Sequence, residues 1–174
     1  MHGAWPRLHA RLGTTTLPVP PSETPLAPLP SDEPSVTVAV VGAHLSGLPL
    51  NWQLVERGAQ LVEITTTAPE YRLFELPDTV PPKPGLLRVA EGGAAITVEL
   101  WRLPECHYGS FVAGIPAPLG IGTLTLADGR SVQGFVCEAA ACAGAIDITD
   151  YGGWRNYLDA GTRGSSRTAP QLQT

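Results

Sequence analysis

The sequence predicts an α+β fold, in which a small curled mixed β-sheet or barrel carries two or three short helices. The segment 36–41 is apolar nearly throughout, as expected of a strand that is covered on both faces. Segments 122–126 and 131–137 have strand composition and flank an Asp-Gly turn, which favours a hairpin. Segments 49–57 and 153–158 carry the signals of short helices.

In the first half of this domain, two further strands follow the first helix. That helix, at 49–57, ends at Gly58, a residue typical of C-terminal caps. Segments 59–65 and 71–75 then have the composition of strands. Three prolines, at positions 81, 82 and 84, interrupt the pattern again.

The second half contains the clearest local signals. Residues 96–101 alternate in character, as in a half-buried strand, and the hairpin turns at 127–130. Residues 147–149 offer N-capping side chains for the last helix, in which Trp154 and Leu158 share one face.

Composition divides the chain into four parts. Seven prolines fall within 17–34, which predicts an extended linker. Residues 1–16 have a short apolar pattern at helical spacing, too short to be stable alone, and we interpret them as the end of an upstream domain. Residues 35–160 form the predicted domain, and 161–174 lose all periodicity and are expected to be disordered.

Charge and cysteine content exclude several classes of protein. The net charge is −5 and basic residues do not cluster, which argues against nucleic-acid binding. No apolar run approaches the ~18 residues of a membrane span, and the amino end lacks the apolar core of a secretory signal. The three cysteines follow no metal-binding spacing and are expected to be buried free thiols. The sequence thus predicts a cytoplasmic protein with no metal or cofactor.

The best candidate for a functional site is the turn after the first strand, Gly42-Ala43-His44-Leu45. Free backbone N–H groups and an imidazole at the carboxyl end of a buried strand are typical of ligand sites. Gly42 allows the backbone to approach a ligand closely. His44 is interpreted as a general acid or an anion-binding group, and the alternative is a histidine hydrogen-bonded within the core.

Other segments offer weaker candidates. Cations and a phenol occur at 71–72 and 83–86, where exposed ion-pairing side chains are the default interpretation. The apolar segment 116–122 is either a pocket wall or a buried crossover into the hairpin. His107 follows Cys106, but adjacent side chains point different ways, so we expect a surface position. The predicted binding residues are Gly42, Ala43, Leu45, Tyr71, Arg72, Lys83, Gly85, Leu119 and Gly120.

Five segments together resemble the carboxy-terminal domain of allophanate hydrolase. They are VVGAHLSGLPLN at 40–51, TAPEYRL at 67–73, KPGL at 83–86, IPAPLGIG at 115–122 and DITDYGGW at 147–154. The resemblance runs in order from residue 36 to residue 158. The amino segment 1–16 also looks like the end of that enzyme's amidase domain.

The resemblance implies a γ-glutamyl cyclotransferase-like fold, in which the loop after the first strand binds the substrate. In this family an amidase domain with a Ser-Ser-Lys triad removes ammonia from allophanate during urea and cyanuric-acid breakdown. This sequence contains no such triad region, so amide hydrolysis is not expected of it. The cyclotransferases' catalytic glutamate is not clearly reproduced at 104–107, so cyclotransferase activity is not expected either.

The role implied for this domain is decarboxylation of N-carboxycarbamate, the product of the amidase domain, with a first-loop histidine as catalyst. That histidine corresponds to His44, which would donate a proton to the departing nitrogen. Arg72 or Lys83 would meet the dianionic substrate.

The alternative is a non-catalytic assembly domain, because carbamates lose CO2 readily without help. Such a domain would hold amidase protomers together as a homo-oligomer, or dock other pathway enzymes. Trp101, Trp154 and Tyr157 are candidates for the contact surface, although large aromatics are more often core residues.

Overall fold

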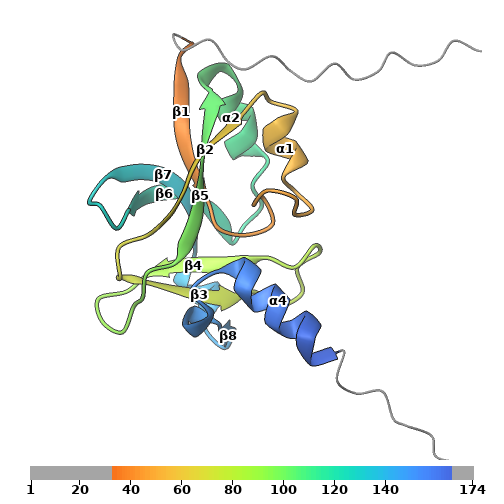
Figure 1. Ribbon diagram of the computed structural model, residues 1–174, viewed down its shortest axis with the longest axis vertical. Coiled ribbons are helices and arrows are strands. Elements are labelled where there is room, and N and C mark those ends of the chain that lie inside the picture. Colours follow the sequence, from red (N-terminus) through yellow and green to blue (C-terminus); the bar gives the residue numbers. More distant parts are fainter. Residues whose placement is uncertain (1–32, 166–174) are drawn as a thin grey trace, which may run out of the picture.

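The computed structural model describes residues 33–165, which form two β-sheets flanked by short helices (Figure 1). The elements are β1 (Ser35–Val40), α1 (Trp52–Val55), β2 (Gln60–Thr66), β3 (Tyr71–Glu75), β4 (Pro84–Arg88), β5 (Thr97–Pro104), α2 (Glu105–Ala113), β6 (Leu119–Thr125), β7 (Ser131–Cys137), α3 (Ala139–Cys142), β8 (Ile146–Asp147), the 3-10 helix η1 (Thr149–Tyr151) and α4 (Trp154–Ser165). None of the helices in this part of the chain has the length and apolar character of a membrane span.

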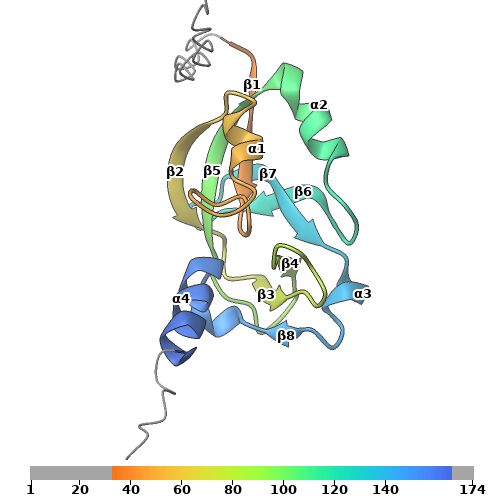
Figure 2. The same cartoon turned by 90° about the vertical axis from the view of Figure 1, so that its right-hand side faces the viewer.

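The larger sheet has five strands in the order β2-β5-β1-β7-β6, and the smaller has three in the order β4-β3-β8. Within the larger sheet β1 runs parallel to β7, whereas its other neighbouring strands are antiparallel. The smaller sheet is antiparallel throughout. Helices α1 and α2 lie beside the larger sheet, and α4 lies beside the smaller one (Figures 1 and 2). The α+β class is thus confirmed, but both sheets stay open and no barrel closes in the described residues.

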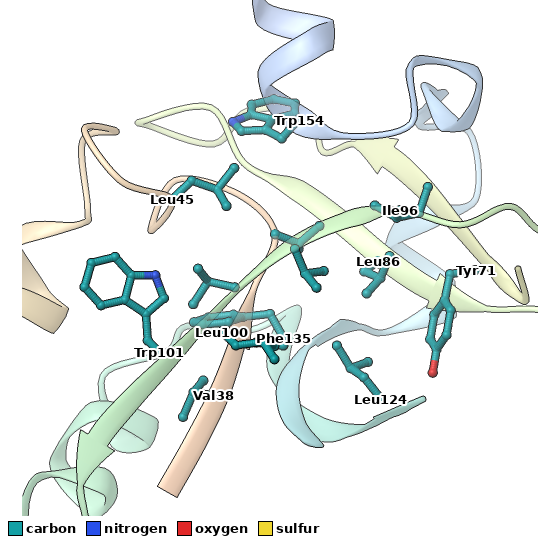
Figure 3. Packing of buried hydrophobic residues seen from close by; sticks show 14 of the residues in the cluster. Val38, Leu45, Tyr71, Leu86, Ile96, Leu100, Trp101, Leu124, Phe135 and Trp154 are labelled. Carbon is teal, nitrogen blue, oxygen red and sulfur yellow. The ribbon is translucent and has the colours of Figure 1, made fainter. Parts of the chain in front are cut away.

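The core is a cluster of buried residues from both sheets and from the loop that follows β1. Strand β1 is central in its sheet, and its apolar residues 38–40 are fully buried, whereas Ser35 and Thr37 at its start are exposed. The cluster draws side chains from strands of both sheets and from α4 (Figure 3). Labelled members are Val38, Leu45, Tyr71, Leu86, Ile96, Leu100, Trp101, Leu124, Phe135 and Trp154. Trp101 and Trp154 are therefore core residues, and Tyr157 packs against the same cluster half-buried.

Several predicted boundaries were wrong. The first helix is only α1, because turns occupy the residues before Trp52. Helix α2 was not predicted, since only Phe111 in it is buried and it shows no apolar stripe. Strand β4 begins at Pro84, which a strand tolerates as its first residue.

The last helix is longer than expected. Helix α4 continues to Ser165, so the predicted onset of disorder at 161 falls inside the helix. The Thr162 hydroxyl donates to the carbonyl of Leu158, four residues earlier, as is common on a helix. The sequence has no apolar periodicity here, so its pattern did not reveal this part of the helix. The predicted upstream remnant at 1–16, nearly all of the linker at 17–34, and residues 166–174 lie outside the described residues.

The cysteines are free, as expected, but not all are buried. Cys137 and Cys142 are buried beside Leu76 in a second, smaller cluster. Cys106 is exposed on α2, because that helix buries only one side chain.

Candidate functional site

A pocket of about 200 Å³ opens beside the turn that follows β1. Its walls come from that turn, from α1, from the segment leading into β4, and from the connection between α2 and β6. The lining residues are Val41, Gly42, Ala43, His44, Leu50, Gln53, Val80, Pro81, Lys83, Pro84, Gly114, Ile115, Pro116, Leu119 and Phe135. Most are apolar, and His44, Gln53 and Lys83 supply the polar side chains, which is the usual composition of a small-molecule site.

Gly42 explains how β4 reaches the turn. A Cβ atom at this position would lie 2.5 Å from Pro84 Cδ and 2.8 Å from Pro84 Cγ. Only glycine leaves room for the proline ring there. This close approach brings Lys83, the residue before β4, to the same pocket as His44.

The His44 ring is fixed on several sides. It stacks on Phe135 with ring centroids 4.9 Å apart and meets the edge of Phe111 at 5.5 Å. Its Nε2 lies 2.9 Å from Gln53 Oε1, and Asn51 Nδ2 donates to the His44 carbonyl at 2.9 Å. With Gln53 Oε1 as acceptor, Nε2 carries the proton of the neutral ring. Within residues 33–165, Nδ1 has no hydrogen-bond partner and is the nitrogen left for a ligand.

The charge of His44 follows from its surroundings. Burial lowers the pKa of the imidazole, the hydrogen bond to Gln53 opposes this, and the nearby Lys83 ammonium lowers the pKa further. The net shift is below the ordinary value, so the ring is neutral at pH 7 when nothing anionic occupies the pocket.

The structure brings together five of the residues proposed from the sequence. Gly42, Ala43 and His44 line the pocket from the turn after β1, Lys83 from the segment before β4, and Leu119 from the start of β6.

Tyr71 and Arg72 do not line this pocket. Tyr71 is fully buried, and its hydroxyl accepts hydrogen bonds from Arg88 Nη2 at 2.6 Å and from the Thr125 amide at 2.9 Å. Arg72 Nε donates to the Gly92 carbonyl at 2.8 Å, and its guanidinium lies 3.6 Å from Asp147. Both side chains form hydrogen bonds or ion pairs with residues of the smaller sheet and of the segments next to it, so neither is positioned to bind a ligand beside His44.

Three further candidates also lie elsewhere. Leu45 points into the core. Gly85 packs against Cys137, since a Cβ there would lie 2.9 Å from its sulfur. Gly120 follows Leu119 in β6 but does not contribute to the pocket wall.

Sequence reasoning missed Gln53 and Phe135, which hold the imidazole. Gln53 is nine residues from His44, and Phe135 lies in the distant hairpin strand β7, so no local pattern joins them. The described residues contain no group of three or more His, Cys, Asp or Glu side chains suited to a metal ion.

Comparison with known proteins identifies the family. The model of the allophanate hydrolase C-terminal domain matches residues 36–159. The chain belongs to this family. A urea amidolyase from Lachancea kluyveri is 45% identical over 133 residues, which are 74% of this chain and 7% of that protein. This member therefore spans a small part of its longer relative.

Solved structures agree with that assignment. A Kluyveromyces lactis allophanate hydrolase is 42% identical with a TM-score of 0.70, over 73% of this chain and 21% of that one. An AIG2-like protein from Mus musculus covers 80% of this chain and 99% of its own, at 18% identity and a TM-score of 0.51. At that identity the likeness concerns the fold alone, which is the γ-glutamyl cyclotransferase-like fold expected from the sequence.

Proposed function

We propose that this allophanate hydrolase C-terminal domain binds N-carboxycarbamate and decarboxylates it, with His44 as the general acid. The observation that carries the proposal is one pocket wall that presents a fixed imidazole with an open Nδ1, close to a lysine. The substrate would come from an amidase domain of the full-length protein, acting in the cytoplasm on the way from urea or cyanuric acid.

The electrostatics favour a small dianion. The described residues that line the pocket include Lys83 as a cation and no carboxylate. The Leu45 amide donates to the Gly42 carbonyl at 2.9 Å, and the other backbone N–H groups of the turn would add hydrogen bonds to a carboxylate. A bound dianion opposes the effect of Lys83 on the imidazole and raises the pKa of His44, which favours protonation of the ring when the substrate binds.

The proposed step consumes no water. The bond between nitrogen and one carboxylate carbon breaks, CO2 leaves, and the electron pair stays on nitrogen. Nitrogen takes the proton from His44 Nδ1, which leaves carbamate and a neutral imidazole. Gln53 holds Nε2 throughout and so keeps Nδ1 as the working nitrogen.

The direct test is His44→Asn in the full-length enzyme. Asparagine keeps a polar side chain but carries no transferable proton, so CO2 release should lag behind ammonia release. The matched control is His107→Asn, which changes an exposed histidine of α2 outside the pocket. Unchanged coupling of CO2 and ammonia release in His44→Asn would remove the catalytic proposal.

A non-catalytic assembly role is the second candidate, and edge strand β2 favours it. Leu61, Val62 and Ile64 are 42%, 60% and 63% exposed at the edge of the larger sheet. Edge strands usually carry charges or proline as protection. Strand β2 has one carboxylate, Glu63, which is paired with Arg130, and its exposed apolar side chains suit a contact with other parts of the full-length assembly. Under this role, deleting residues 36–158 from the full-length protein shifts its mass in size-exclusion chromatography beyond the lost residues, whereas initial ammonia release stays near normal.

A further inference from the structure

The turn that carries His44 is tied to the larger sheet by a buried carboxylate. Glu99 lies on β5 and is only 2% exposed. Its Oε2 accepts hydrogen bonds from the Ser46 amide at 2.8 Å, from the Ser46 hydroxyl at 2.9 Å and from Trp101 Nε1 at 3.1 Å. The residue two positions after His44 is thus held through both its backbone and its side chain.

An arginine from α4 completes this anchor. Arg155 Nη2 donates to Glu99 Oε1 at 2.9 Å and to the Ser46 carbonyl at 2.5 Å. Ser46 therefore has its amide, its hydroxyl and its carbonyl all engaged by one charge pair. Gly47 turns the chain immediately afterwards with a φ of 74°.

The same turn is held independently on its other side. Asn51 Nδ2 donates to the His44 carbonyl, and Gln53 meets the His44 ring. His44 therefore lies between two anchors, one formed by α1 and the residue before it, the other by β5 and α4. With only one of these anchors, the turn would be free to pivot about it. Catalytic groups must be held in position to within a fraction of an ångström, so both anchors matter for His44.

Burial alone would raise the pKa of Glu99, but the hydrogen bonds from Ser46, Arg155 and Trp101 outweigh it and lower the pKa. The side chain is consequently a carboxylate at neutral pH. A buried charge that accepts four hydrogen bonds is hard to replace by a neutral group of the same shape, because an amide would turn donors toward donors.

We propose that Glu99 is a positioning residue for the His44 pocket, acting through Ser46 and supported by Arg155. The proposal deepens the proposed function and rests on it for the pocket's ligand. It assigns a role to a residue that touches neither the ligand nor the His44 ring.

The experiment compares three variants of the 174-residue chain. Glu99→Gln removes the charge that holds Ser46, and Ser46→Ala removes only one of the hydrogen bonds. The matched control is Glu63→Gln, the same change in the Arg130-paired carboxylate on β2. Malonate serves as the probe in calorimetry, and 15N signals of the His44 ring report its tautomer and pKa.

We expect Glu99→Gln to bind malonate about tenfold more weakly and Ser46→Ala about threefold more weakly than the wild type. Both should shift the His44 ring signals toward a mixture of tautomers, and Glu63→Gln should do neither. If Glu99→Gln does not fold, Ser46→Ala decides, because it leaves the core intact.

Wild-type affinity together with wild-type His44 signals in Ser46→Ala, and in Glu99→Gln where it is folded, would overturn the positioning role. A destabilised variant that still binds malonate normally has the same meaning, because Glu99 would then only stabilise the fold. Failure of the wild type to bind malonate would count against the proposed function instead. In that case the ring signals alone decide the role of Glu99.

Discussion

Replacing Gly42 with alanine tests how tightly the turn and β4 are packed. The added Cβ would lie 2.5 Å and 2.8 Å from two ring carbons of Pro84. Carbon atoms normally pack at about 3.5–4.0 Å, so one partner must move by about 1 Å. Pro84 is buried at the start of β4 and its ring is rigid, so the movement must come from the backbone.

Overpacking of this kind costs about 1–3 kcal/mol of the free energy of unfolding. For a domain of this size that lowers the Tm by roughly 4–10 °C. Urea denaturation followed by tryptophan fluorescence gives the free energy, and calorimetry gives the Tm. The matched control is Gly120→Ala, since a Cβ at Gly120 meets open space and should change the free energy by less than about 0.5 kcal/mol. Equal stability of Gly42→Ala and the wild type would refute the packing argument.

Three further predictions follow from burial. The lowered pKa of His44 stabilises the fold above the unfolded-state pKa of about 6.5, and this contribution is lost as pH falls from there toward the folded pKa. Denaturation midpoints between pH 7 and pH 5 should therefore fall less in His44→Asn than in the wild type, and parallel pH curves would contradict this. Trp154→Ala removes a side chain that is 2% exposed and should lower the free energy of unfolding by about 3–5 kcal/mol. Trp52→Ala, at 56% exposure, should lower it by less than about 1 kcal/mol. Similar losses for the two variants in urea denaturation would argue against α4 as part of the core. A thiol reagent at pH 8 should label exposed Cys106 in the folded protein and Cys137 only after unfolding, because burial raises the pKa of Cys137 to about 12. Mass spectrometry measures the labelling of each cysteine, and equal rates for Cys106 and Cys137 in the folded protein would disprove this prediction.

Local patterns were sufficient to predict a strand where its own residues determine its extent. Strand β7 coincides with the predicted segment 131–137, and β3 coincides with 71–75. The apolar run at the start of the domain predicted a strand covered on both faces, and this holds for residues 38–40 of β1, which are fully buried, but not for Thr37, which is exposed. Helix α2 escaped prediction because its apolar residues form no stripe, and its position is set by packing of Phe111 against the rings of His44 and Phe135.

Long-range packing, which local patterns do not show, also explains which of the candidate residues line the pocket. Lys83 reaches the pocket because it precedes β4, the strand that touches the turn at Gly42. Tyr71 and Arg72 lie on β3, one strand further away, and point to opposite sides of it. Pairing order between strands is a long-range property, so a sequence that contains all of these groups does not show which of them meet.

The sequence by itself determined the family, the fold class and the turn where the imidazole lies, because these depend on residue order and on local backbone preferences. The tertiary structure decided which groups surround that imidazole. Gln53, Phe135 and Lys83 come from separate elements, and only packing brings them to one pocket. The buried charge pair behind the turn was equally hidden, since Glu99 and Arg155 are 56 residues apart in the chain and meet only in the folded protein.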